Sequence, residues 1–317
     1  MGLGVRRGGT LMPTCIHRHG KPAESHAMLD ASVHTAPARV YPLGHSPQEL
    51  DRLTIQAQRL AEDSVTLLRR AGITKGQRVL DIGCGPGDLS FHAAELVGPK
   101  GRVVGIDASA AALDAARVRA ARLGYENVEF IACDLEEESA FRGFDAIIGR
   151  LVLMYVSDPV VVLRRLRAAL RPGGLIVLQE PDGETAGSTP DCPLFRRMRG
   201  WILTAFEAAG SLVNLGSSLG GMLRRAGYSV EGSYVWQPAL VGPTLANIDW
   251  FVDLVHTLMP IIERRGIATA EEIDIDTLGA RLFAEATTLD AMLFEPRLVG
   301  IWARDDTGAA AATRSRS

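Results

Sequence analysis

A glycine-rich loop between a predicted strand and a predicted helix is the part of this sequence best suited to binding a small molecule. It lies in the segment VLDIGCGPGD, from Val79 to Asp88. Glycines allow a tight turn and a close approach of the backbone to a ligand, and the start of the helix offers free N–H groups. In a dinucleotide-binding loop, G-x-G-x-x-G, the last glycine would stand where Asp88 stands. Because a carboxylate repels a pyrophosphate, the loop favours a cationic ligand over the cofactor of an NAD-dependent oxidoreductase.

Two further acidic residues close the next two predicted strands. Asp107 ends the segment VVGID and Asp134 ends FIACD. The carboxyl ends of parallel strands meet at one edge of a sheet, so these side chains and the loop should ring a single crevice. Asp107 follows the glycines by about 20 residues, the position from which a carboxylate accepts hydrogen bonds from ribose hydroxyls. The spacing therefore predicts a nucleoside-containing ligand.

The motif DIGCGPG, with the strands that follow it, resembles the class I S-adenosylmethionine-dependent methyltransferases over residues 78–179. The resemblance implies that the cofactor is S-adenosyl-L-methionine and that the glycine loop wraps its methionine moiety. It implies that Asp107 holds the ribose, that Asp134 accepts from the adenine amino group, and that Asp81 orients the loop and the amino group. The cofactor-binding residues that it implies in the core are Asp81, Gly83, Cys84, Gly85, Gly87, Asp107, Ala108, Asp134, Leu135 and Arg150.

The segment before the core, from Tyr41 to Gln56, is similar to a lid helix of small-molecule methyltransferases in bacterial natural-product pathways. The similarity implies that Tyr41 packs over the sulfonium, where an aromatic face next to a cation contributes ~0.5–2 kcal/mol. The alternative is that Tyr41 only anchors the first helix. Ser46, Pro47 and Glu49 carry the pattern of a helix start, with Ser46 as N-cap.

Candidates for proton transfer lie after late strands and in a predicted helical lid. Methyl transfer from a sulfonium is an in-line displacement, and it needs a general base only if the acceptor starts protonated. Glu180, Tyr155 and His256 are the candidate catalytic residues, although Glu180 and His256 also suit structural roles. No compact cluster of carboxylates or histidines predicts a metal site. Large apolar side chains that could line an acceptor pocket are Met198, Trp201, Phe206, Trp236, Trp250, Phe251 and Met259.

Alternating apolar strands and helices predict an α/β fold: a doubly wound, mostly parallel seven-stranded sheet, Rossmann-like, with an N-terminal lid helix and a C-terminal helical insertion. The predicted strands are 78–82, 102–106, 128–132, 146–149, 175–179, 228–236 and 298–304. The expected organisation is a disordered extension at 1–38, a methyltransferase domain at 39–304 and a flexible tail at 305–317. Within that domain we expect a lid helix at 46–70, a cofactor-binding core at 76–180 and substrate-side helices at 190–226 and 244–290.

Composition and charge limit the partners. The chain has 317 residues and a formal net charge of −3, and only three of its 34 basic residues are lysines, a ratio that codon bias in a GC-rich bacterial genome explains. No basic stripe points to nucleic acid, and residues 149–152 (GRLV) lack the N/D-P-P-Y/F pattern of base-amino methyltransferases. The resemblance to natural-product methyltransferases implies an enzyme of secondary metabolism that acts on a small-molecule acceptor. From the sequence we expect a cytoplasmic protein that binds neither nucleic acid nor membrane, and a homo-oligomer is possible. The open alternatives are a nucleic-acid or protein methyltransferase, an oxidoreductase, and a non-catalytic binding module.

Overall fold

The computed structural model describes residues 43–44, 47–137 and 140–306. Tyr41 and Ser46, the proposed extension and most of the proposed tail lie outside these ranges. The elements of the core are α1 (Pro47–Arg59), α2 (Ala61–Ala71), β1 (Arg78–Ile82), α3 (Asp88–Val97), β2 (Arg102–Asp107), α4 (Ala110–Leu123), β3 (Val128–Ala132), β4 (Phe144–Arg150), α5 (Pro159–Leu166), β5 (Leu170–Asp182), α7 (Gly216–Arg225), β7 (Tyr228–Trp236) and β10 (Arg297–Asp305).

A seven-stranded sheet forms the centre of the molecule, in the order β3-β2-β1-β4-β5-β10-β7. The pairs from β3 to β5 are parallel, and β10 runs antiparallel to both β5 and β7. The order reverses between β1 and β4, so the carboxyl ends of these strands open onto a topological switch point, where ligands bind in doubly wound sheets. The predicted fold class is confirmed.

Helices cover both faces of this sheet. Alternate residues of the strands face opposite ways, so that Val79 packs with α2 and α3 while Leu80 belongs to the cluster that includes α5 and α7. A third cluster joins Phe91 of α3 and Leu113 of α4 to Phe130 of β3. Strands buried on both faces need apolar residues throughout, which explains runs such as 175–178.

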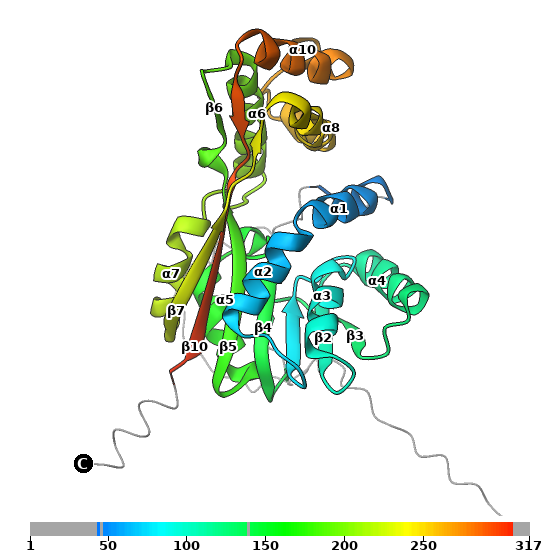
Figure 1. The fold of residues 1–317 in the computed structure, drawn as a ribbon, viewed down its shortest axis with the longest axis vertical. Coiled ribbons are helices and arrows are strands. Elements are labelled where there is room, and N and C mark those ends of the chain that lie inside the picture. Colours follow the sequence, from blue (N-terminus) through cyan, green and yellow to red (C-terminus); the bar gives the residue numbers. More distant parts are fainter. Residues whose placement is uncertain (1–42, 45–46, 138–139, 307–317) are drawn as a thin grey trace, which may run out of the picture.

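A second lobe rises above the carboxyl ends of the strands (Figure 1). It contains α6 (Pro193–Ala208), α8 (Asp249–Arg264), α9 (Ala270–Ile273) and α10 (Ile275–Thr288), with a small sheet in the order β6-β9-β8. These strands are β6 (Gly187–Thr189), β8 (Ala239–Leu240) and β9 (Met292–Phe294), and they are too short for the sequence pattern to indicate. We expected both helices of 190–226 on the substrate side, but only α6 is there. The other, α7, buries Leu219 and Leu223 against the main sheet.

The predicted lid helix is broken in two at Leu60. The α1 segment leaves α2 and crosses between the sheet and the upper lobe (Figure 1). Neither glycine nor proline stands at the break, so tertiary contacts decide it. On one side Arg59 pairs with Glu295, and on the other Ser64 bonds to groups at the ends of β4 and β5.

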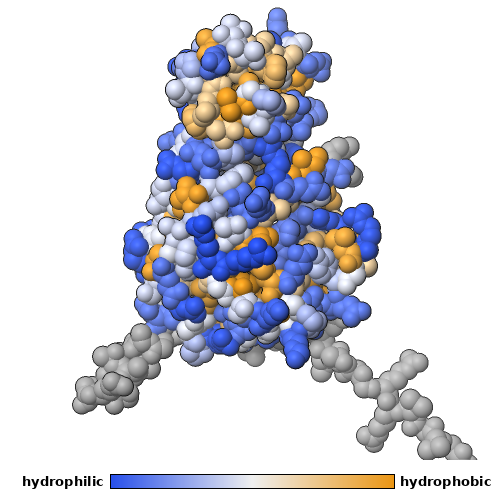
Figure 2. All heavy atoms as spheres, viewed as in Figure 1, coloured by the Kyte–Doolittle hydropathy of each residue, from blue (hydrophilic) through white to orange (hydrophobic). Residues whose placement is uncertain are grey.

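One helical stretch among the described residues, Gly242–Arg264, is long and apolar enough by length and composition to cross a membrane. This is weak evidence, because a packed helix of a folded lobe passes the same test. Phe251, Leu254, Val255, Leu258 and Ile262 of this stretch are buried against the lobe. On the face seen in Figure 2, hydrophilic and apolar residues are intermixed over both lobes.

Candidate active site

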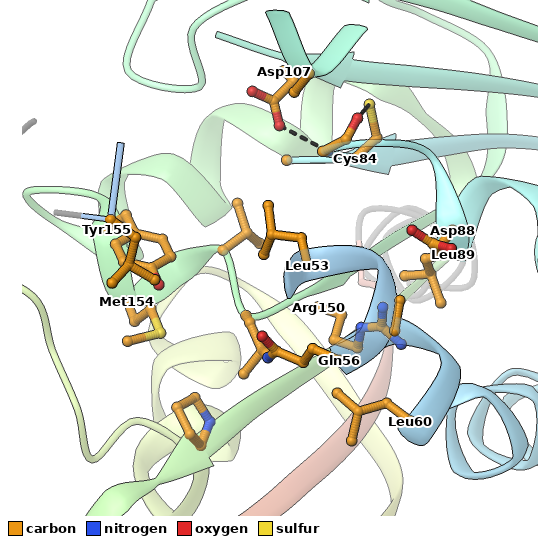
Figure 3. A pocket seen from close by; sticks show the side chains of 18 of the residues that line it. Leu53, Gln56, Leu60, Cys84, Asp88, Leu89, Asp107, Arg150, Met154 and Tyr155 are labelled. Atoms are coloured by element: carbon orange, nitrogen blue, oxygen red, sulfur yellow. Dashed lines mark hydrogen bonds between the residues drawn. The ribbon is translucent and has the colours of Figure 1, made fainter. Parts of the chain in front are cut away.

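A cavity of about 610 Å³ lies between the carboxyl ends of the strands and the overlying α1, α6 and α8. The loops after β1, β2, β3 and β4 form one end, and the start of β10 forms the other. Figure 3 shows Leu53 and Gln56 of α1, with Leu60 at the helix break, across from Arg150 and Met154. Residues from both halves of the chain therefore enclose one site.

The glycine loop has a backbone that side chains rarely tolerate. Gly83, Gly85 and Gly87 all have positive φ, at 59°, 51° and 90°. A Cβ at Gly83 would lie 2.3 Å from Cγ2 of Val152, and one at Gly87 would lie 2.9 Å from the Phe130 ring. Around Gly85 a Cβ would meet nothing within 4 Å, so this glycine borders open space. The loop therefore packs closely against Val152 and Phe130 at Gly83 and Gly87, and at Gly85 its backbone borders open space.

Asp107 is fixed beside this loop by backbone donors. The N–H of Gly85 donates to Oδ2 of Asp107 at 2.8 Å, and the N–H of Ser109 donates to Oδ1 at 2.8 Å. Each carboxylate oxygen can accept a further bond. A half-buried carboxylate in the cavity wall, oriented by two N–H groups, is suited to bind a pair of hydroxyls.

Asp81 is a buried carboxylate with one oxygen that is hydrogen-bonded within the described part of the chain and one that is not. Its Oδ2 accepts from Ser90 Oγ at 2.5 Å, and its Oδ1 has no partner among the described residues. Burial is the main reason that the pKa of Asp81 is raised to about 7, while Ser90 and the charge of Arg150 oppose the shift. Because Asp81 also lines the cavity, a cationic donor there would satisfy Oδ1 and hold the carboxylate ionised.

Arg150 at the end of β4 supplies positive charge beside Asp81 and the glycine loop. Its NH1 donates to Ser64 Oγ of α2 at 2.9 Å, and that hydroxyl donates to Oε1 of Gln179 at 3.2 Å. Burial lowers the pKa of Arg150, while the charges of Asp88 and Asp81 raise it. Nε2 of Gln179 is buried without a partner among the described residues. Ser64 and Gln179 were missed from the sequence because single polar residues in apolar elements give no periodic signal.

Glu180 does not line the cavity, contrary to its expected place as a candidate base. It is fully buried, and its Oε1 accepts from the N–H groups of Val152 at 3.0 Å and Leu153 at 2.8 Å. Burial raises the pKa of Glu180 to about 7 against these backbone bonds. Leu151, just before this turn, has φ of 55°, a strained value for a branched residue. Glu180 therefore supports the strained turn that presents Leu151 and Tyr155 to the cavity.

Asp88 forms an ion pair, so the expectation that it repels a pyrophosphate does not hold. Its carboxylate forms two bonds to the guanidinium of Arg119, at 2.6 and 2.8 Å, and Arg119 also donates to the carbonyl of Pro86 at 2.7 Å. Because Arg119 neutralises Asp88, that residue alone would not repel a pyrophosphate. Two arginines, Arg119 and Arg150, do reach the loop region, each near a carboxylate.

The remaining predicted residues are distributed unevenly. Asp134 and Tyr155 line the cavity, and Oδ1 of Asp134 accepts from the N–H of Glu136 at 2.9 Å. His256 is exposed on α8 and is not part of the lining, so the structure does not bring it to the site. The other predicted cofactor contacts in the cavity wall are Gly83, Cys84, Gly85, Ala108 and Leu135, whereas Gly87, which packs against Phe91 and Phe130, is not part of the lining.

The end of the cavity under the upper lobe is apolar and aromatic. Of the seven side chains expected to line it, Phe206, Trp236 and Trp250 do so. The lining does not include Met198, Trp201, Phe251 and Met259, which pack in or against the hydrophobic core instead. Arg59 and Glu295, absent from the sequence prediction, also reach this end. Within the described part of the chain, no group of three or more His, Cys, Asp or Glu residues could hold a metal ion.

Comparison with known proteins matches the part of the chain that carries the glycine loop and the parallel strands. A family model described as a methyltransferase domain matches residues 73–202. Aklanonic acid methyltransferase DauC of Streptomyces sp. (strain C5) is 38% identical over 119 residues, which are 37% of this chain and 54% of the relative. Demethylmenaquinone methyltransferase of Staphylococcus aureus (strain JH9) is 32% identical over 133 residues, 42% of this chain and 52% of the relative. The chain thus spans about half the length of these curated relatives.

A solved structure shares the fold over a longer span. A candidate methyltransferase from Bacillus halodurans C-125 superposes with a TM-score of 0.52 and 17% identity, covering 77% of this chain and 99% of that one. At this identity the likeness shows the fold alone.

Proposed function

We propose that the whole protein is an S-adenosylmethionine-dependent methyltransferase with a small-molecule acceptor. The premise is that residues 73–202 match the methyltransferase-domain family, as the resemblance of the glycine loop implied. The relatives named above carry methyltransferase names, and their named substrates are small molecules. One observation of the structure carries the proposal. A single cavity places the half-satisfied buried carboxylate of Asp81 and the guanidinium of Arg150 next to a glycine loop and Asp107.

These groups match the cofactor group by group. Its amino group suits the free Oδ1 of Asp81, its carboxylate suits Arg150, and its ribose diol suits Asp107. Asp134 and Leu135, in the loop after β3, suit the adenine. Gly85 has no Cβ and therefore leaves space for the cofactor next to the loop. When bound, the cofactor supplies an activated methyl group on a sulfonium. The chain's own residues bind and orient the reactants for in-line displacement and keep water out with α1, α6 and α8.

The two lobes divide this work in our proposal. The sheet domain binds the cofactor, and the upper lobe, with its aromatic lining, binds the acceptor. The relative named for aklanonic acid supports a role in bacterial secondary metabolism. We also propose that the enzyme is cytoplasmic. The apolar stretch in α8 buries side chains in its own lobe, and we assign it no role in a membrane.

Isothermal titration calorimetry tests the proposal. We expect the protein to bind S-adenosylhomocysteine and not NAD⁺, and Asp107→Ala to weaken that binding. Asp114→Ala is the matched control, because Asp114 is exposed on α4 and, within the described ranges, pairs only with neighbouring Arg117. NAD⁺ binding without S-adenosylhomocysteine binding would overturn the proposal in favour of an oxidoreductase.

A further inference from the structure

A polar cluster of Arg59, Glu295 and Trp250, here called the Arg59 cluster, lies in the otherwise apolar acceptor end of the cavity. The guanidinium of Arg59 pairs with Oε1 of Glu295 and lies 5.4 Å from the centroid of the Trp250 ring. NH1 of Arg59 also donates to the carbonyl of Asn247 at 3.3 Å. The three side chains come from α1, from α8 and from the segment between β9 and β10, and all three line the cavity.

The cluster has unused hydrogen-bonding capacity of both kinds. Glu295 is 4% exposed, and among the described residues its carboxylate hydrogen-bonds only through Oε1. Nε1 of Trp250 is a buried donor with no partner among the described residues. Buried polar groups are nearly always hydrogen-bonded, so unpartnered ones in a cavity wall point to a ligand. An acceptor oxygen and an N–H donor near one guanidinium together suit a group that both donates and accepts.

The charges select a neutral group. An ammonium on the ligand would meet the guanidinium of Arg59, and a carboxylate or phosphate on the ligand would meet Glu295. Because Arg59 and Glu295 already neutralise each other, neither kind of ion gains net attraction. A hydroxyl donates to Oε2 of Glu295 and accepts from Nε1 of Trp250 without adding a charge.

The fold places this cluster far from the predicted ribose site. In the sheet order, β1, β4 and β5 lie between β2, which ends at Asp107, and β10, which follows Glu295. At ~4.8 Å per strand, these four steps separate the two ends of the site by about 19 Å. The cavity wall also carries apolar and aromatic side chains from α6, α8, β7 and β10: Leu203, Phe206, Leu254, Trp236 and Leu298.

We propose that the Arg59 cluster is an acceptor-recognition subsite, which binds a neutral hydroxyl on a largely apolar, aromatic acceptor. The inference rests on the proposed function, since it assigns the substrate class of the same site. Glu295 and Trp250 are specificity residues in this proposal. Arg59 is a positioning residue, because it orients Glu295 and ties α1 to the upper lobe.

The test compares two probes that differ in one group, 2-naphthol and 2-methoxynaphthalene, by equilibrium dialysis with saturating S-adenosylhomocysteine. We expect the wild type to bind 2-naphthol about fivefold more tightly, the effect of one added hydrogen bond. Glu295→Leu should bring this ratio close to one, because only the hydroxyl can donate to Glu295. Trp250→Phe should weaken the binding of both probes, because the oxygen of a hydroxyl and the oxygen of a methyl ether can both accept from Nε1 of Trp250. Glu231→Leu is the matched control, because Glu231 forms an exposed ion pair with Arg304 at the distant sheet edge.

The result also separates this inference from the proposed function. Equal affinity of the wild type for both probes, no binding of 2-naphthol up to its solubility limit, or unchanged affinity for both probes in Trp250→Phe would overturn the subsite, provided that S-adenosylhomocysteine still binds. If the wild type does not bind S-adenosylhomocysteine, the proposed function is overturned instead. Trp250→Phe keeps an aromatic ring in place, and its loss of affinity for both probes is a second readout that does not depend on the folding of Glu295→Leu.

Discussion

Replacing the buried carboxylate of Asp81 should make the ligand-free protein more stable and the cofactor complex weaker. Asp81→Asn keeps the size of the side chain and an oxygen to accept from Ser90, but it removes the charge. In the wild type, burial opposes ionisation and raises the pKa of Asp81 from 3.8 to about 7. The folded protein therefore holds a proton that the unfolded chain releases between these two pH values.

The sign and size of the effect follow from this difference. At pH below 3.8 the carboxyl is protonated in both states, and the folded state keeps its full stability. As pH rises from 3.8 to about 7, the folded state loses stability relative to the unfolded chain by ~1.4 kcal/mol per pH unit, and the loss is complete above 7. A shift of about three units sets a ceiling of ~4 kcal/mol. Asp81→Asn escapes this loss, so its advantage over the wild type should grow by ~2–3 kcal/mol between pH 5 and pH 8.

Urea denaturation of the ligand-free protein at the two pH values, followed by tryptophan fluorescence, measures this difference. Asp114→Asn serves as the control, because its side chain is 74% exposed and carries no comparable burial cost. At pH 8, where Asp81 is ionised, Asp81→Asn should also bind S-adenosylhomocysteine more weakly, by ~1–3 kcal/mol, the cost of a lost bond to a charged acceptor. A stability difference that does not change with pH would refute the assignment of Asp81 as a buried carboxyl with a raised pKa.

Three further changes test other parts of the site. Asp107→Ala should weaken S-adenosylhomocysteine binding by ~1–3 kcal/mol in calorimetry, and unchanged affinity would rule out its ribose role. Gly83→Ala should lower the free energy of unfolding by ~1–3 kcal/mol, because its Cβ would meet Val152 at 2.3 Å. Gly76→Ala, at φ of 84° with open space around it, shows the smaller cost of backbone strain alone. Glu180→Ala should cost ~1–3 kcal/mol in chemical denaturation, whereas Glu180→Gln, which still accepts from the turn, should retain stability at pH 8; equal losses would contradict the supporting role.

The glycine loop shows how far local sequence signals reach. Its turn, the strand before it and the helix after it depend on residues adjacent in the chain, since Gly83, Gly85 and Gly87 must adopt positive φ. Asp107 was predictable as well, because parallel strands bring their carboxyl ends to one edge whatever the details of packing. The core strands and helices followed from apolar patterning in the same way.

The acceptor side was not predictable to the same degree. Glu180 and His256 looked alike in the sequence, as polar residues near a predicted site. Packing turned Glu180 toward the backbone of the turn after β4 and left His256 exposed on α8. Asp88 looked like a free charge until α4 brought Arg119 to it from 31 residues away in the chain.

The sequence alone therefore determined the α/β fold, the glycine loop and the row of acidic residues at the strand ends. These features are encoded over short stretches by backbone conformation and apolar periodicity. Only the tertiary structure decided which polar groups pair, where the lid helix breaks, and that Arg59 meets Glu295 across 236 residues of chain. Such pairings depend on how separate elements pack against one another, and no local pattern of residues records that packing.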